Sequence, residues 1–219
     1  PILGDMSGMD HDAMSGMDHA APTQNAPAAG EMAGMSMSGM NMRDPENAPP
    51  DMAVGVGVDA IAMDPANRLG ERPIGLTTVD HRVLVYTDLV SLQPNKDPRP
   101  PSRTMEIHLT GNMERFMWGF DGRKFSELVE PIRFERNERV RVTLVNDTMM
   151  THPIHLHGMW SDLEDANGNF LVRKHTIDMP PGSKRSYRVT ADALGRWAYH
   201  CHLLLHMEMG MFREVRVDE

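Results

Sequence analysis

The chain has 219 residues, of which 22 are basic and 31 acidic, and its formal net charge at pH 7 is -9. This acidic balance argues against nucleic acid or an anionic membrane surface as a partner and favours cations. No apolar stretch reaches the roughly 18 residues needed to span a bilayer, and the first residues do not show the charged-then-apolar pattern of an export signal. The single cysteine, Cys201, excludes an internal disulfide framework.

Residues 1–52 form a methionine-rich segment with little material for a core. Between Leu3 and Val54 there is no Val, Ile, Leu, Phe, Trp, Tyr or Cys, so we expect this segment to be disordered. It contains the repeat MSGMDH, and thioethers are soft ligands suited to Cu(I). The segment is therefore predicted to bind copper, with a low-complexity linker as the alternative. The candidate Cu(I) ligands are Met6, Met9, His11, Met14, Met17, His19, Met35, Met37, Met40 and Met42.

Residues 53–104 are rich in proline and are predicted to be a linker with lead-in strands, one of them near 83–86. From residue 105 the pattern changes to short alternating runs separated by turns, and 105–219 are predicted to form a separate domain. Many short strands of this kind indicate an all-β fold, a Greek-key β-sandwich preceded by the disordered segment. The expected strands of the domain are 105–109, 116–120, 132–134, 140–145, 185–189, 197–199 and 212–217.

The run HCHLLLHMEMGM near the end of the chain has the composition of a copper site. Cys201 supplies a thiolate, His206 an imidazole five residues later, and Met211 a weak thioether beyond it. A blue-copper centre needs a second imidazole from a distant strand, and His152 in the run HPIHLHG is the candidate. Zinc also accepts cysteine and histidine, but it has no use for an axial methionine or for the HCH alternation.

The remaining histidines of the two motifs suggest a second metal environment. Side chains alternate faces along a strand, so His155 and His157 point together, as do His200 and His202, while Cys201 points away. Two copper environments would then share one strand, with the Cys201 backbone as a short covalent route for electrons. His200 and His202 are therefore the candidate electron-transfer residues beside Cys201.

Other polar residues are assigned structural roles. His81, His108 and His175 lie outside the motifs and are interpreted as structural or solvated. Asn146 to Thr148, just before the first motif, are predicted to form a strand-end turn whose side chains bond local backbone. A role behind the ligating imidazoles is left open for them, because the second ring nitrogen of such an imidazole is usually held by a partner.

These motifs resemble the two C-terminal copper motifs of the multicopper oxidases. The chain most resembles the C-terminal part of periplasmic copper-resistance oxidases of the copper resistance protein A type. The resemblance implies a cupredoxin-like domain, a periplasmic location and copper as the cofactor. The resemblance implies that the type 1 copper ligands are His152, Cys201 and His206, with Met211 axial. It also implies that His155 is a type 2 ligand and that the type 3 ligands are His157, His200 and His202.

The family completes its trinuclear cluster with two further His-x-His motifs from an N-terminal cupredoxin domain, and no such motif occurs in residues 1–150. We therefore expect half of the cluster here and predict that the missing domain, in this or another chain, is a partner. A second departure is Met207, which stands where some cuprous oxidases carry a carboxylate.

Three functional hypotheses follow. The first is an oxidase domain in copper resistance that takes electrons from Cu(I) or another reductant and passes them towards dioxygen, with His206 nearest the surface as the point where electrons enter. The second is a copper-sequestering or delivering protein that depends on the methionine-rich segment. The third is a simple electron-transfer cupredoxin, which would have no use for His155 or His157.

Overall fold

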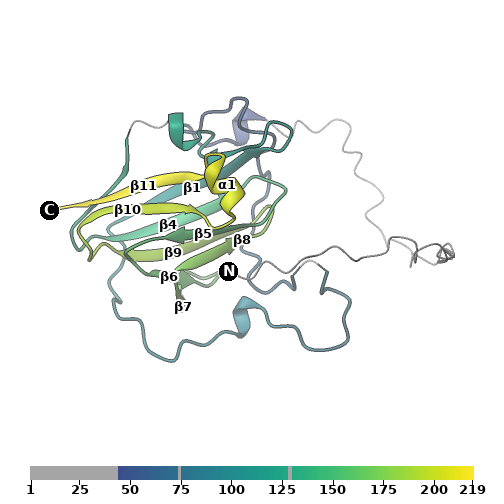
Figure 1. Ribbon diagram of the computed structural model, residues 1–219. Coiled ribbons are helices and arrows are strands. Elements are labelled where there is room, and N and C mark those ends of the chain that lie inside the picture. The colour runs from purple at the N-terminus through teal and green to yellow at the C-terminus, as the bar shows by residue number, and fades with distance from the viewer. Residues whose placement is uncertain (1–43, 74, 128–129) are drawn as a thin grey trace, which may run out of the picture. The chain divides into compact units, whose positions relative to one another are not determined.

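The computed structural model describes residues 44–73, 75–127 and 130–219. The Cu(I) ligands predicted between Met6 and Met42, and nearly all of the predicted disorder, lie outside the described residues. Within the described part, most of the regular secondary structure is β-strand, and the strands form two sheets (Figure 1). The predicted all-β sandwich is confirmed. No helix in the described ranges has the length and apolarity to cross a membrane.

The larger sheet has six strands in the order β2-β1-β4-β9-β6-β7. These strands are β2 (Met117–Phe120), β1 (Arg103–Asn112), β4 (Arg139–Asn146), β9 (Lys184–Thr190), β6 (Ser161–Glu164) and β7 (Phe170–Lys174). Strands β1 and β4 pair in parallel and the other pairs are antiparallel. Three of the neighbouring pairs, β1–β4, β4–β9 and β9–β6, join strands that are not consecutive in sequence, as expected for a Greek-key arrangement.

The smaller sheet has five strands in the order β3-β11-β10-β5-β8 and carries both histidine motifs. These strands are β3 (Ile132–Glu135), β11 (Phe212–Asp218), β10 (Gly195–Cys201), β5 (His152–Leu156) and β8 (Thr176–Met179). A short helix, α1 (Leu204–Glu208), connects β10 to β11. The two strands that hold the motifs, β5 and β10, are therefore direct neighbours.

Alternating burial along the strands produces the core between the sheets. In β9 the odd-numbered residues, among them Tyr187 and Val189, are buried, and the even-numbered ones are half-buried. In β5 the side chains of His152, Ile154 and Leu156 are buried, whereas the intervening ones are half-buried. Cys201 belongs to the same buried cluster. The period of two residues thus sends one part of each metal motif into the core.

The predicted strand at 83–86 is wrong. The structure has instead a 3-10 helix, η3 (Tyr86–Asp88), which begins where the Asp88 carboxylate accepts a hydrogen bond from the backbone N–H of Val85 at 3.1 Å. A local side-chain cap of this kind competes with strand pairing. Two other 3-10 turns, η2 (Pro45–Asn47) and η4 (Phe125–Glu127), lie outside the sheets.

Three strands, β6, β7 and β8, were not expected, and β6 shows why. Its sequence, Ser-Asp-Leu-Glu, is typical of a loop, yet all four residues are buried. Arginines of β4 and β7 neutralise its two carboxylates. Asp162 accepts from Arg139 at 2.8 Å and from Arg173 at 2.9 Å, and Arg141 lies 2.9 Å from Glu164. Arg139 and Asp162 are each only 2% exposed, so this ion pair is shielded from water.

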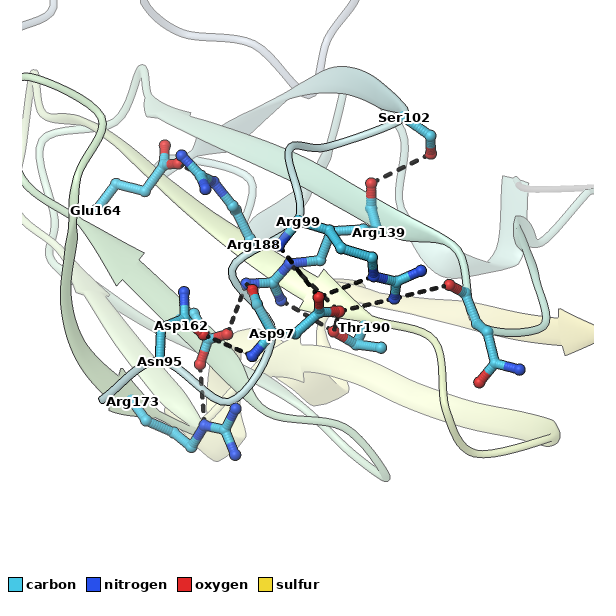
Figure 2. Close-up of polar contacts among 11 residues, drawn as sticks. Asn95, Asp97, Arg99, Ser102, Arg139, Asp162, Glu164, Arg173, Arg188 and Thr190 are labelled. Carbon is cyan, nitrogen blue, oxygen red and sulfur yellow. Dashed lines mark hydrogen bonds and ion pairs between the residues drawn. The ribbon is translucent and has the colours of Figure 1, made fainter. Parts of the chain in front are cut away.

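The same charge network holds part of the lead-in segment on the six-stranded sheet (Figure 2). The Asp97 carboxylate accepts from Arg99 at 2.7 and 2.8 Å and from the Thr190 hydroxyl at 2.6 Å. The Asp97 carbonyl accepts from Arg139 at 2.9 Å. Leu69, further back in the lead-in, lies in the main core cluster. Residues predicted as a linker therefore cover part of the sandwich. The predicted boundaries at 52/53 and 104/105 stay a prediction.

We expect Asp97→Asn to lower the free energy of unfolding at pH 7 by about 1 to 3 kcal/mol, the range for hydrogen bonds to a charged group. The Arg99 guanidinium and the Thr190 hydroxyl hold the pKa of Asp97 well below its ordinary value, despite partial burial. A lowered folded-state pKa contributes stability above the unfolded-state pKa, and this contribution is lost as pH falls below about 4. Urea denaturation should thus show the difference between the two proteins shrinking from pH 6 to pH 3.

Asp192→Asn removes an exposed carboxylate and supplies the baseline. A difference between wild type and Asp97→Asn that stays constant across this pH range would contradict the role given to Asp97.

Candidate metal centre

The pairing of β5 with β10 sets the positions of both histidine motifs. Cys201 lies opposite Ile154, and His200 lies opposite His155. Because paired residues share a face of the sheet and successive residues alternate, Cys201 and His152 are directed into the core while His155 and His200 lie on the other face. The predicted separation of Cys201 from its histidine neighbours is thus present in the structure.

A buried group of three potential metal ligands occupies the core side of this sheet. The ligand atoms of His152, Cys201 and His206 all lie within 4.8 Å of one another. The two Nδ1 atoms of the histidines are 3.1 Å apart, and each lies 3.7 Å from the Cys201 Sγ atom. All three side chains are buried. We call this set the buried trio.

The buried trio fits a copper ion in both chemistry and size. An imidazole nitrogen bonds a first-row metal ion at about 2.0 Å and a thiolate sulfur at about 2.3 Å. The separations of 3.1, 3.7 and 3.7 Å between the ligand atoms are compatible with bonds of these lengths to one ion. A trigonal set of two histidines and one cysteine is the arrangement typical of blue-copper centres.

Met211 closes the loop that bears the buried trio. Its carbonyl accepts from the Cys201 N–H at 3.1 Å, and its own N–H donates to the His206 carbonyl at 2.9 Å. The Met211 side chain is fully buried in the same cluster as Cys201. Both ends of the loop from Cys201 to Met211 are therefore fixed to each other.

His206 is buried, although it is the most exposed member of the buried trio, since His152 and Cys201 are fully buried. Its role as the point where electrons enter stays a prediction. Its side chain is 2% exposed because helix α1 turns it inward, against the indole of Trp118. The two rings stack with centroids 4.3 Å apart and planes 22° from parallel. The exposed ring of Phe116 lies beyond, 6.3 Å from Trp118. Trp118 therefore separates the buried trio from the surface on this side.

Burial makes the trio neutral when no ion is present. It raises the pKa of the Cys201 thiol to about 11, and with the neighbouring His206 it lowers the pKa of His152 to about 3. Burial also lowers the pKa of His206. At pH 7 the site therefore offers a protonated thiol and two uncharged imidazoles. A bound cation is needed to stabilise the thiolate.

Four histidines form a second cluster on the opposite side of β10. The ring of His155 lies 4.5 Å from that of His157 and 5.7 Å from those of His200 and His202. The Nε2 atoms of His157 and His200 are 3.0 Å apart, close enough to hold one ion together. His157 and His202 are exposed and His155 is half-buried. The cluster thus faces solvent in this chain.

Hydrogen bonds orient two of these rings for metal binding. The Nδ1–H of His155 donates to the His175 carbonyl at 2.5 Å, and the Nδ1–H of His200 donates to the Cys201 carbonyl at 2.9 Å. Each bond leaves the Nε2 lone pair of that ring free. Burial and the neighbouring imidazoles lower the pKa of His155 and His157, which favours the neutral, ligating form.

The histidines outside the motifs occupy structural or exposed positions. His81 is exposed, and His108 donates to the buried Asp147 carboxylate at 2.6 Å. His175 is exposed, but its carbonyl supports His155. The sequence did not single out this carbonyl or Trp118. A backbone partner has no residue type to recognise, and Trp118 stacks on a residue far along the chain.

These features define a two-layer β-sandwich with a buried cysteine–histidine metal site beside a histidine cluster. The sequence model of the multicopper oxidase family matches residues 98–219. The chain belongs to the multicopper oxidase family, which confirms copper as the predicted cofactor.

Relatives with curated descriptions carry the same copper-resistance name. Copper resistance protein A of Escherichia coli is 56% identical over 98% of this chain and 38% of its own length. Copper resistance protein A of Pseudomonas syringae pv. tomato is 68% identical over 74% of this chain and 26% of its own length. The expected similarity to copper resistance protein A is confirmed, and the chain spans only about a quarter to two fifths of these relatives.

A solved structure of a multicopper oxidase from Campylobacter jejuni, a metallo-oxidase, aligns with 58% of this chain and 32% of its own, at 21% identity and a TM-score of 0.49.

We expect uptake of Cu(II) at pH 7 to release the Cys201 proton, since burial holds the pKa of this thiol near 11. The apparent affinity should therefore rise about tenfold for each pH unit between 6 and 8. Competition with a chelator at several pH values measures this slope.

Cys201→Ser is the matched control, because a serine hydroxyl has no proton to release in this range. Its affinity should be weaker and its slope smaller by one proton. Equal slopes for the two proteins would contradict copper ligation by Cys201.

Proposed function

We propose that this chain is the electron-accepting copper domain of a multicopper oxidase that acts in copper resistance. His152, Cys201 and His206 would hold a type 1 copper with Met211 as its axial ligand. The observation that carries the proposal is the buried trio, with its 3.1 and 3.7 Å separations around the one cysteine. Bound copper would supply one-electron redox chemistry that no side chain of the trio offers alone.

Two connections link the buried trio to the histidine cluster. Cys201 is bonded through its own backbone to His200 on one side and His202 on the other. The Cys201 carbonyl also accepts from the His200 ring at 2.9 Å, which shortens the path from the thiolate to that imidazole. These residues would carry electrons from the core side of β10 to its other face.

The cluster supports half of a trinuclear site. We assign His155 as a type 2 ligand and His157, His200 and His202 as type 3 ligands. The 3.0 Å contact between His157 and His200 favours one shared ion for that pair. Since the cluster faces solvent, further ligands can reach it from outside. A domain with two more His-x-His motifs, in the same protein or another chain, would complete the site that reduces dioxygen to water.

The side of the trio at Trp118 is the proposed route for electrons from the reductant, in place of direct exposure of His206. Trp118 stacks on His206, and Phe116 extends the aromatic contacts to the surface. Cu(I) is the proposed substrate, or another small reductant, and the methionine-rich segment would raise the local concentration of Cu(I). The periplasm is the proposed compartment, by similarity to copper-resistance oxidases.

We expect the copper-loaded chain to accept one electron from a phenolic reductant but to consume dioxygen only together with a domain that supplies the missing His-x-His motifs. An oxygen electrode measures consumption for the chain alone and for the mixture or the longer protein. Changing both His155 and His157 to Ala should lower oxygen consumption of the complete protein by more than about a hundredfold, because loss of two ligands should cost more than the tenfold to hundredfold typical of residues behind the ligands.

Oxygen consumption by the chain alone at the rate of the complete protein would contradict this division of ligands. Retention of full activity by the His155/His157 double variant would favour a simple electron-transfer cupredoxin. Removal of residues 1–42 distinguishes the oxidase from a copper-storage protein. Phenol oxidation should survive the removal in an oxidase, whereas copper capacity should collapse in a storage protein.

A further inference from the structure

The hydroxyl of Thr148 lies behind the copper ligand His152. Its Oγ1 atom is 2.7 Å from the Nε2 atom of His152, on the side of the ring away from Cys201. Thr148 and His152 are both buried, so the contact is shielded from water. The other ring nitrogen, Nδ1, faces His206 and Cys201. The proton on this ring therefore decides whether a lone pair points at the metal position.

The remaining contacts of the Thr148 hydroxyl settle where its own proton goes. Two oxygen acceptors lie within reach, the Asn146 Oδ1 at 2.9 Å and the Met150 carbonyl at 3.1 Å. One donor also reaches it, the Met150 N–H at 3.2 Å. A hydroxyl has one proton and two acceptor lone pairs. If that proton went to His152, two oxygen atoms would face the hydroxyl oxygen with no hydrogen between them.

One arrangement places the hydroxyl proton in the shorter of the two oxygen contacts and leaves only the 3.1 Å contact with the Met150 carbonyl without a hydrogen. The Thr148 hydroxyl donates to Asn146 and accepts from the Met150 N–H and from the Nε2–H of His152. The proton of His152 is then on Nε2, and its Nδ1 lone pair is directed at the buried trio. If the hydroxyl donated to His152 instead, both oxygen contacts would lack a hydrogen, and the repulsion between these oxygen atoms favours the Nε2–H tautomer of His152.

Asn146 is itself held in one orientation. Its amide NH₂ donates to the Met150 carbonyl and to the Met179 carbonyl, each at 2.7 Å. Its Oδ1 accepts from the Thr148 N–H at 2.9 Å as well as from the hydroxyl. A flipped amide would direct its oxygen at two carbonyl oxygens, which excludes that orientation. Asn146 is fully buried at the end of β4, where the strand fixes it.

We infer that Thr148, oriented by Asn146, is a positioning residue that fixes His152 as the Nε2–H tautomer and so prepares the buried trio for copper. The inference deepens the proposed function and rests on its assignment of His152 as a copper ligand. Neither residue touches the metal position, and both act through the His152 ring. The local-backbone role predicted for Asn146 and Thr148 is also present, and the role behind the imidazole is the one that bears on the metal site.

The two imidazoles of the trio then have different roles in metal uptake. In the described part of the chain, the ring nitrogens of His206 contact only His152 and Cys201. Without an ion, the Nδ1–H of His206 donates to the Nδ1 of His152 across 3.1 Å. Copper binding must then move the His206 proton to Nε2, while His152 keeps its proton on Nε2 throughout.

The test is long-range nitrogen–proton NMR correlation of the histidine rings in the metal-free chain. We expect the pattern of an Nε2–H tautomer for His152 and of an Nδ1–H tautomer for His206. After loading with Cu(I), which is diamagnetic, His152 should keep its pattern and His206 should change to Nε2–H. An Nδ1–H pattern for His152 in the wild-type chain would overturn the inference without any need for a variant.

Three variants add a second readout. Thr148→Val keeps the shape but removes the hydroxyl, so His152 should show mixed tautomers and copper affinity should fall about tenfold to a hundredfold, the usual range for such partners. Thr148→Ser should restore both. Thr143→Val removes another buried hydroxyl, which lies on β4 and bonds to Ser186 at 2.8 Å. This variant should change neither the His152 tautomer nor the copper affinity. Unchanged tautomer and affinity in Thr148→Val would also overturn the inference.

Failure of the proposed function gives a different result. If the expected tautomers appear in the metal-free chain but the His152 and His206 signals do not respond to copper, the assignment of the trio as the copper site is wrong while the positioning by Thr148 holds.

Discussion

The pairing of β5 with β10 is the contact on which the metal centre depends. A strand sends successive side chains to opposite faces, so one pair of neighbouring strands creates two separate environments. His152 and Cys201 enter the dry core, and His155 and His200 face the other side. A shift of one residue in this register would exchange the two sets and leave no buried trio. The register between β5 and β10 therefore creates both metal environments, and helix α1 adds His206 to the buried one.

The sandwich around this pair prepares the trio before an ion arrives. The loop from Cys201 to Met211 is closed by backbone hydrogen bonds, and Trp118 covers His206. Burial keeps the thiol protonated and the imidazoles neutral, so the empty site carries no buried charge. On the outer face of the larger sheet, paired charges such as Arg139 and Asp162 hold the lead-in segment in place. These charges thus fix the six-stranded sheet, against which the sheet that bears the ligands packs.

The chemistry of the site could be predicted from sequence because residue type and spacing define it. Cysteine between two histidines, followed by His206 and Met211, combines soft and borderline ligands in an order that other roles do not require. The β-sandwich could be predicted from runs of alternating apolar and polar residues, such as those that form β4 and β9. Strand β6 could not be predicted, since its carboxylates look solvated until arginines from distant strands neutralise them. The burial of His206 and the contacts of Thr148 depend on tertiary packing and were equally hidden.

The central claim is that Cys201, His152 and His206 bind copper together, and the visible absorption spectrum tests it most directly. The chain is loaded with copper without oxygen and then gently oxidised. The account predicts an intense blue band from the thiolate–copper bond, absent in Cys201→Ser. Tightly bound copper with no such band, or the same band in Cys201→Ser, would contradict it.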